Sequence, residues 1–143
     1  MKISTKGRYA LRLMLDIALH GSGEPVRLVD AAKRQEISVK YLEQIVGTLT
    51  RAGYLKSIRG PQGGYRLVKE PSQITAGEIL RVMEGSLAPV ECLEPGAKTC
   101  PRASACVTLR LWKELDAAVR SVVDRHTLRE LMDWSREEEK TGT

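Results

Sequence analysis

Three cysteines are the residues of this chain best suited to chemistry, and they lie within one fifteen-residue stretch, at Cys92, Cys100 and Cys106. In a reducing compartment such a cluster indicates a metal site or thiol redox chemistry more than a structural disulfide. Thiolates are soft ligands that suit iron–sulfur clusters, zinc or copper(I). Zinc sites usually contain short Cys-x-x-Cys spacings, which this stretch lacks. The spacing therefore leaves two main alternatives, an iron–sulfur cluster and a thiol–disulfide switch.

The segment that carries the cysteines is the one long irregular stretch of the chain, SLAPVECLEPGAKTCPRASA (86–105). A loop of this length inside a small domain is usually functional or disordered. Cys106 follows it directly and lies near the N-terminus of a predicted helix, where the helix dipole favours a thiolate. We therefore treat residues 85–106 as a candidate sensor loop.

The stretch ISVKYLEQIVGTLTRAGYLKSIRGPQGGYRL (37–67) predicts a recognition helix followed by a β-hairpin wing. Ser38 is a suitable N-cap, apolar residues recur at helical spacing from Leu42 to Leu49, and Gly53 suits the end of the helix. Two short alternating strands then flank a glycine-rich turn, RGPQGG. A short helix predicted over residues 29–36 precedes this unit and completes a helix-turn-helix.

The free face of the predicted recognition helix is suited to DNA. Gln44 can pair with adenine, Glu43 can accept from cytosine, and Lys40 can hold a phosphate. Arg59 at the wing tip suits a narrow minor groove. The alternatives are a protein-binding winged helix, a packing role for Tyr9 and plain solvation of Lys2. The predicted DNA-binding residues are Ser38, Lys40, Tyr41, Glu43, Gln44, Thr48, Arg51, Ser57, Arg59, Gly60, Pro61, Gln62 and Gly63, with Tyr9 and Lys2 as candidate phosphate contacts.

Charge is unevenly distributed along the chain. Residues 1–70 contain 13 Lys/Arg and 6 Asp/Glu, a net charge of +7, whereas residues 71–143 contain 10 and 12, a net charge of −2. This asymmetry favours a nucleic-acid face and predicts salt-dependent binding. We expect a cytoplasmic protein, because no apolar run could span a bilayer and no apolar signal core follows the first residues. We expect no enzyme activity, since the chain offers no triad-like grouping, phosphate loop or paired carboxylates.

The remaining segments are predicted to hold and pair the winged helix. They comprise a first helix to about His20, a capped helix that begins after Thr75, a long helix over 104–125 and a final helix over 128–138. The wide apolar stripe of the long helix predicts a homodimer seam; the alternative is that it folds back onto the core of its own chain. The predicted organisation is a winged helix-turn-helix domain (1–84), the sensor loop (85–106), and a dimerisation helix with a C-terminal helix (107–143).

The wing signature SIRGPQGGYRL and the helix signature YLEQI resemble those of the bacterial iron–sulfur cluster regulators. This family includes IscR-type cluster sensors, nitric-oxide-sensing relatives and a cysteine-metabolism regulator. The opening MKISTKGRYALRLMLDIA and the cysteine loop are similar too, so the resemblance covers nearly the whole chain. It implies that Cys92, Cys100 and Cys106 hold a 2Fe–2S or 4Fe–4S cluster.

Two positions depart from the pattern of that family. IscR-type members place a histidine three residues after the third cysteine, where this chain has Leu109. Nitric-oxide-sensing relatives use an acidic residue near the start of the first helix, where this chain has Arg8 and Arg12. The fourth cluster ligand is thus unidentified, with Glu91, Glu94, a residue of a partner subunit or an external ligand as candidates.

Together these patterns predict a mostly α (α+β) protein: a winged helix-turn-helix domain with a long C-terminal dimerisation helix. The expected function is a homodimeric, DNA-binding transcriptional regulator, a repressor, whose binding to a pseudo-palindromic operator responds to the cluster. It would sense cluster supply, redox state or nitric oxide. The alternative is a cluster-free regulator that responds to thiol oxidation or to binding of a metabolic enzyme, such as one of cysteine biosynthesis.

Overall fold

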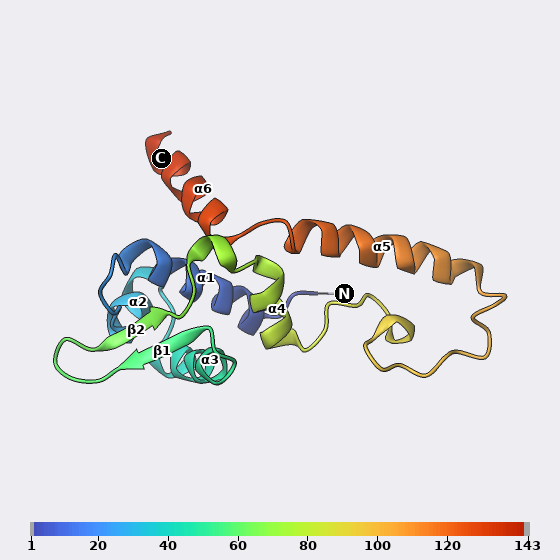
Figure 1. The fold of residues 1–143 in the computed structure, drawn as a ribbon, viewed down its shortest axis with the longest axis horizontal. Coiled ribbons are helices and arrows are strands. Elements are labelled where there is room, and N and C mark those ends of the chain that lie inside the picture. The colour runs from blue at the N-terminus through green and yellow to red at the C-terminus, as the bar shows by residue number, and fades with distance from the viewer. Residues whose placement is uncertain (1, 142–143) are drawn as a thin grey trace.

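The computed structural model describes residues 2–141 and confirms a mostly α fold with one small antiparallel sheet. No helix among these residues combines the length and apolar character that a membrane crossing requires. In chain order (Figure 1) the elements are α1 (Thr5–His20), α2 (Leu28–Gln35), α3 (Val39–Arg51), β1 (Leu55–Ile58), β2 (Gly64–Leu67), η1 (Pro71–Gln73), α4 (Ala76–Glu84), η2 (Glu91–Leu93), α5 (Val107–Val123) and α6 (Leu128–Lys140).

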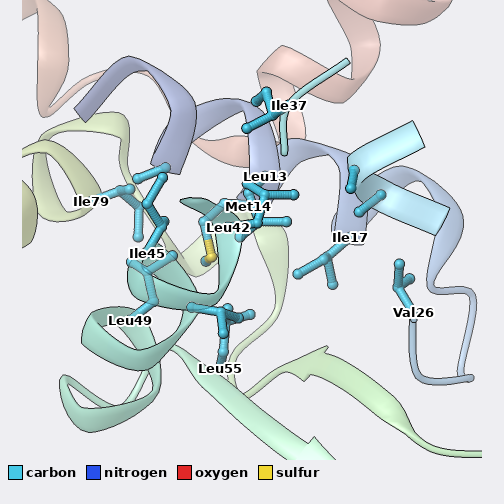
Figure 2. Close-up of a cluster of buried hydrophobic side chains, with 14 of the residues drawn as sticks. Leu13, Met14, Ile17, Val26, Ile37, Leu42, Ile45, Leu49, Leu55 and Ile79 are labelled. Carbon is cyan, nitrogen blue, oxygen red and sulfur yellow. The ribbon is translucent and has the colours of Figure 1, made fainter. Parts of the chain in front are cut away.

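Helix α1 lies at the centre of the winged-helix unit and packs against α2, α3, α4, α6 and β2. It begins where the Ser4 hydroxyl accepts a backbone N–H of the first turn, the expected N-cap bond. Leu13 and Met14 of α1 are completely buried. Figure 2 shows them converging with Ile45 of α3 and Ile79 of α4, so one aliphatic core holds the three helices together.

Helix α3 has the boundaries that its sequence predicts. The Ser38 hydroxyl accepts the N–H of Tyr41 at 3.1 Å and caps the N-terminus. The helix ends at Arg51, with Ala52 as its C-cap, and Gly53 follows with a φ of +87°, a conformation that glycine adopts without steric cost. The apolar positions face the core and leave the polar face free; they are Leu42, Ile45, Val46 and Leu49.

Strands β1 and β2 form the hairpin of the wing, with Leu55 opposite Leu67 at the end nearest the core. Val26, which precedes α2, extends the hairpin by exchanging two backbone hydrogen bonds of 2.8 Å with Tyr65. Gly64 makes this approach possible, because a Cβ at this position would lie 2.4 Å from the Val26 carbonyl oxygen. Strand β2 of the wing is therefore fixed to the segment that starts the helix-turn-helix.

The predicted capping box of α4 is present. The Thr75 hydroxyl accepts the N–H of Glu78 at 3.1 Å, and the Glu78 carboxylate accepts the N–H of Thr75 at 2.8 Å. One helical turn later, Arg81 donates two hydrogen bonds to Asp124, the C-cap residue of α5. We call this pair, with Gly77 beside it, the α4–α5 joint.

Helix α5 projects away from the winged-helix unit. The cysteine loop runs from α4 out to the far end of α5, and α5 then runs back toward α6 (Figure 1). No residue of α5, all of which the structure describes, is buried. Three of its apolar side chains are open to solvent in the single chain, with exposed fractions of 84% for Val107, 54% for Leu111 and 49% for Val122. Its other large apolar side chains are half-buried; they are Leu109, Trp112, Leu115, Val119 and Val123. Helix α6 instead returns to α1, where Leu128 and Met132 are buried.

The boundaries of α5 differ from the predicted 104–125. Residues 101–105 form turns rather than helix, with the Ala103 N–H donating to the Cys100 carbonyl at 3.0 Å. Cys106 then adopts an extended conformation as the N-cap, so the helix begins at Val107 and ends at Val123. The helix starts later than predicted because the turns already satisfy the backbone groups that precede it.

Candidate DNA interface and cysteine loop

The free face of α3 presents the side chains that the sequence predicts for base contacts. Ser38, Lys40, Glu43, Gln44 and Arg51 are exposed, whereas Tyr41 and Thr48 are half-buried. These polar side chains are exposed because the four apolar residues of α3 occupy the buried face of the helix, and the polar residues lie on the opposite face. This face can offer amide, carboxylate and cationic groups to a major groove.

Two residues near the end of α3 are engaged within the helix. The Thr48 hydroxyl donates to the Gln44 carbonyl at 3.3 Å, and the Arg51 guanidinium donates to the Thr48 hydroxyl at 3.5 Å. Both interactions are exposed and replaceable by a DNA phosphate. The first two turns of α3 are thus the part with the most accessible polar groups.

The wing tip is a tight turn in which Gly63 donates its N–H to the Gly60 carbonyl at 2.9 Å. Gly60 has a φ of +107°, in the region that favours glycine. Arg59 is exposed immediately before it. The other predicted wing residues, Ser57, Pro61 and Gln62, are exposed as well, and Gly63 is half-buried. A slim, positively charged loop of this kind fits a groove of DNA.

The two N-terminal candidates lie in different places. Tyr9 is half-buried, and its ring meets that of Tyr41 edge to face, with 5.6 Å between centroids. It therefore packs against the start of α3, which agrees with the packing alternative. Lys2 is exposed and lines a hollow together with Glu84 of α4 and Val119 of α5, neither of which belongs to the wing.

Sequence reasoning missed a buried carboxylate, Asp16 of α1. Its exposed fraction is 0%, and Arg34 of α2 donates two hydrogen bonds to it, at 2.7 and 3.0 Å. The hydrogen bond to Asp16 raises the pKa of the Arg34 guanidinium above its ordinary value. The side chain of Gln35 adds a third bond at 2.9 Å. The available signal was an aspartate within the apolar stripe of the first helix, because such a residue needs a cationic partner.

The three thiols are all free, but the structure brings only two of them to one hollow. Cys92 and Cys100 line it together with Glu91 and Glu94. Cys106 lines a separate hollow along α5. Within residues 2–141, no three His, Cys, Asp or Glu side chains are close enough together to hold one metal ion. The donor chemistry suits an iron–sulfur cluster, and the loop would have to bring Cys106 to the other two thiols.

Cys106 lies at the N-cap of α5, as its position in the sequence predicts. A hydrogen bond with the Thr108 hydroxyl at 3.3 Å, assisted by the backbone N–H of Leu109 and the charge of Arg102, lowers the pKa of the Cys106 thiol. Thiolate is both the form that binds metals and the form that reacts with oxidants. Cys106 is therefore suited both to binding an iron–sulfur cluster and to thiol oxidation, the two alternatives that the sequence leaves open.

The two candidate fourth ligands within the chain, Glu91 and Glu94, lie at the hollow of Cys92 and Cys100. Leu109, where IscR-type members have a histidine, lines the hollow of Cys106 and has no donor atom for a metal. The two histidines have ordinary surroundings: His20 is exposed, and His126 is half-buried against Trp134 with an Nδ1 to Glu130 distance of 2.6 Å.

Comparison with known proteins gives consistent matches over most of the chain. Residues 3–134 match the family model Rrf2, described as an iron-dependent transcriptional regulator. Protein rrf2 of Nitratidesulfovibrio vulgaris is 43% identical over 132 residues, 92% of this chain and 87% of that protein. The HTH-type transcriptional regulator IscR of Aliivibrio salmonicida is 42% identical over 132 residues, 92% of this chain and 77% of that protein.

Solved structures of two regulators have the same fold. CymR (YrzC), the global cysteine regulator of B. subtilis, superposes with a TM-score of 0.79 at 43% identity and covers 94% of this chain and 98% of its own. IscR of T. potens superposes with a TM-score of 0.77 at 37% identity and covers 96% and 90%.

Proposed function

Because the chain belongs to the Rrf2 family of transcriptional regulators, and not to a family of enzymes, we propose that it is a homodimeric cytoplasmic repressor controlled by its cysteine loop. Helix α3 and the wing bind a pseudo-palindromic operator. An iron–sulfur cluster held by Cys92, Cys100 and Cys106 sets the affinity for that operator.

The observation that carries the proposal is the path from the thiols to the DNA-binding unit. Cys106 is the N-cap of α5, and Asp124 is the C-cap of the same helix and binds Arg81 of α4. Helix α4 packs on α1 and α3, which carry the core of the winged helix. A single helix thus joins the loop to the DNA-binding unit, so a change at the loop can tilt one against the other.

The unburied stripe of α5 supports the dimer. A helix that is apolar on one side and unburied in its own chain needs a partner surface, and a second copy of α5 offers a matching one. A twofold dimer places two recognition helices on successive major grooves, which is the arrangement that a pseudo-palindrome requires.

The cluster would neutralise and gather the three thiolates, so that its gain or loss changes the shape and charge of the loop. Coupling of about 1–3 kcal/mol between loop and operator corresponds to a change in DNA affinity of roughly 5- to 150-fold. Glu91 and Glu94 are the local candidates for the remaining ligand position.

The decisive experiment begins with anaerobic purification, visible absorption, and assays of iron and sulfide per chain. Operator affinity is then measured for the cluster-loaded and cluster-free forms on a duplex that the protein selects from a random library. We expect a brown protein and an affinity difference within the range above. Equal affinities of the two forms would refute control by a cluster.

A second candidate is favoured by the state of Cys106, whose thiol has a lowered pKa and is exposed. In this version the loop is cluster-free, and either thiol oxidation or a metabolic enzyme controls DNA binding. CymR of B. subtilis is described as a global cysteine regulator, which suggests a cysteine-biosynthetic enzyme as such a partner. A protein that stays colourless after reconstitution, with operator affinity that responds to peroxide or to an added biosynthetic enzyme, would support it.

The DNA-binding surface has its own test. Replacing Gln44 and Arg59 with alanine removes an exposed amide from α3 and the charge from the wing tip. We expect a loss of operator affinity of about 100-fold, since each well-placed contact contributes about 1–3 kcal/mol. Replacing Gln73, an exposed glutamine of η1 outside this surface, is the control and leaves the affinity unchanged. Unchanged affinity of the double variant would refute the proposed surface.

A further inference from the structure

A continuous series of contacts connects the buried Asp16 to the first turn of α3. It passes through Gln35, Arg12 and Tyr9 before it reaches Tyr41. The contacts of Gln35 with Asp16 and Arg12 join α2 to α1, the contact of Arg12 with Tyr9 lies within α1, and the contact of Tyr9 with Tyr41 joins α1 to α3. The series therefore links the packing of α1 on α2 to the end of α3 that enters DNA.

The buried end of this series is fixed. Asp16 is fully buried and accepts two hydrogen bonds from Arg34 and one from the Nε2 of Gln35. A buried carboxylate with three charge-assisted or amide donors is compensated and held in one orientation. The Gln35 side chain is consequently fixed as well, since its amide nitrogen is committed to Asp16.

The orientation of Gln35 determines what it offers to Arg12. Its amide oxygen accepts from the Nε of Arg12 at 3.1 Å, and its backbone carbonyl accepts from Nη2 of the same guanidinium. Two bonds from adjacent nitrogens fix the plane of the group, which is a property of arginine and not of lysine. Arg12 is exposed, so it is held in place by Gln35 rather than by burial.

The fixed guanidinium lies over the ring of Tyr9, 5.2 Å from its centroid. Tyr9 in turn meets the ring of Tyr41 edge to face, at 5.6 Å and an angle of 79°. Tyr41 is the third residue of α3, and its N–H binds the Ser38 cap. In helix-turn-helix proteins, the N-terminal residues of the recognition helix contact the base edges.

We propose that Gln35 and Arg12 are positioning residues for operator recognition, which hold Tyr9 and Tyr41 so that the first turn of α3 meets the bases in one fixed orientation. The inference rests on the proposed use of α3 as the recognition helix. It assigns to α1 and α2 a part in specificity as well as in packing, without requiring Gln35 to touch DNA.

The test uses Arg12→Lys, which keeps the positive charge and removes the planar fork. Affinities are measured for the selected operator duplex and for a random duplex of equal length, and the thermal midpoint is recorded. We expect operator affinity to fall about tenfold, the effect of losing one charge-assisted interaction, while random-duplex affinity changes less than about twofold. The thermal midpoint stays close to that of the parent, because Arg12 is exposed.

Gln35→Ala provides a second route to the same result, because it removes the amide and leaves Asp16 paired with Arg34. The matched control is Arg136→Lys, an exposed arginine of α6 beside Asp133, which leaves both affinities unchanged. Equal losses on operator and random duplexes for Arg12→Lys would overturn the proposal, because they would indicate a plain phosphate contact.

A double-mutant cycle between Arg12→Lys and Tyr41→Leu completes the test. If Arg12 acts through the rings, the double variant binds the operator about as weakly as Tyr41→Leu alone. Additive losses would refute action through Tyr41. Gln44→Ala distinguishes failure of the recognition helix from failure of the positioning role. If Gln44→Ala leaves operator affinity unchanged, the assignment of α3 as the recognition helix is wrong. If Gln44→Ala lowers operator affinity but Arg12→Lys does not, only the positioning role is refuted.

Discussion

The winged-helix unit and helix α5 have similar apolar patterns and opposite degrees of burial. In α3, the apolar stripe from Leu42 to Leu49 lies entirely within the core. In α5, a 17-residue helix, Leu111 and Val122 are about half exposed and no residue is buried. The winged-helix unit buries its apolar residues within a single chain, whereas α5 leaves apolar side chains exposed to solvent.

This difference shows what a periodic pattern specifies. Periodicity identifies the face of a helix that avoids water, because that face repeats every 3.6 residues. It does not identify the surface that covers the face, since a second copy and the core of the same chain satisfy the same pattern. In this chain α6, and not α5, returns to α1 and completes the core with Leu128.

The largest expected effect tests the comparison directly with one leucine from each region. Leu42→Ala removes a completely buried side chain, and we expect it to lower the free energy of unfolding by about 2–5 kcal/mol. Leu111→Ala removes a side chain that is 54% exposed, so the stability of the single chain changes by less than about 1 kcal/mol. Chemical denaturation of dilute protein measures both.

In an association assay we expect the larger effect from Leu111→Ala and the smaller one from Leu42→Ala. Analytical ultracentrifugation over a concentration series is expected to show weakened dimerisation for Leu111→Ala, because the exposed stripe of α5 is the proposed seam. An unaltered dimerisation constant for Leu111→Ala would contradict the assignment of the stripe to a dimer contact.

Local features of the fold were predictable because their signals lie within a few residues. The Ser38 cap, the Thr75–Glu78 capping box and the turn at Gly60 each depend on neighbours in the sequence, and each is present. The exposed face of α3 followed from periodicity in the same way. These short-range signals define the elements to within a few residues.

Contacts between distant residues were not predictable from one sequence. Asp16 and Arg34 are 18 positions apart, and Arg81 and Asp124 are 43 apart. Their pairing depends on how helices pack, which residue spacing does not specify. The arrangement of the cysteine loop has no periodic signal at all, so only the identity of its thiols could be inferred.

Two glycines, Gly64 in the wing and Gly96 in the cysteine loop, allow the two regions to be compared through their backbones. In Gly64→Ala the new Cβ meets the Val26 carbonyl oxygen at 2.4 Å and its carbon at 2.6 Å, and both are backbone atoms of the packed unit. We expect a loss of about 1–3 kcal/mol in unfolding free energy, because strand β2 must separate from Val26. Thermal and urea denaturation measure it.

Gly96 of the cysteine loop is the counterpart. It has a φ of +77°, and a Cβ there would have no atom within 4 Å. Gly96→Ala therefore lowers the unfolding free energy only by the penalty for placing a Cβ in the left-handed conformation, about 1 kcal/mol. A cost as large as that of Gly64→Ala would mean that the loop is as tightly constrained as the wing.

The α4–α5 joint is where the two regions meet, and Gly77→Ala disturbs it selectively. The added Cβ would lie 2.1 Å from an Asp124 carboxylate oxygen and 2.9 Å from Nη1 of Arg81, so the bonded pair must shift. The unfolding free energy changes little, because alanine favours the helix by about 1 kcal/mol while an exposed ion pair contributes about 0–1 kcal/mol. Hydrogen exchange is expected to rise at the end of α5, where Asp124 is the C-cap, and remain unchanged in α3.

The smallest effect is a pH dependence of the same joint. Hydrogen bonds from Arg81 lower the pKa of Asp124 below its ordinary value of 3.8. A carboxylate with a lowered pKa stabilises the fold above its unfolded-state pKa, and this contribution disappears as the pH falls through the folded-state value. Asp124 is 43% exposed, so solvent screening keeps the contribution to a fraction of a kcal/mol.

Asp124→Asn isolates this contribution, because asparagine is neutral at every pH. Near pH 7 the variant has a slightly lower thermal midpoint than the parent. As the pH falls from about 5 towards 3 the two midpoints converge, since the parent then loses the charge that the variant never had. A difference in midpoint that stays constant over this range would show that shape, and not charge, holds Asp124 to Arg81. The path from Cys106 to the recognition helix would then depend on packing alone.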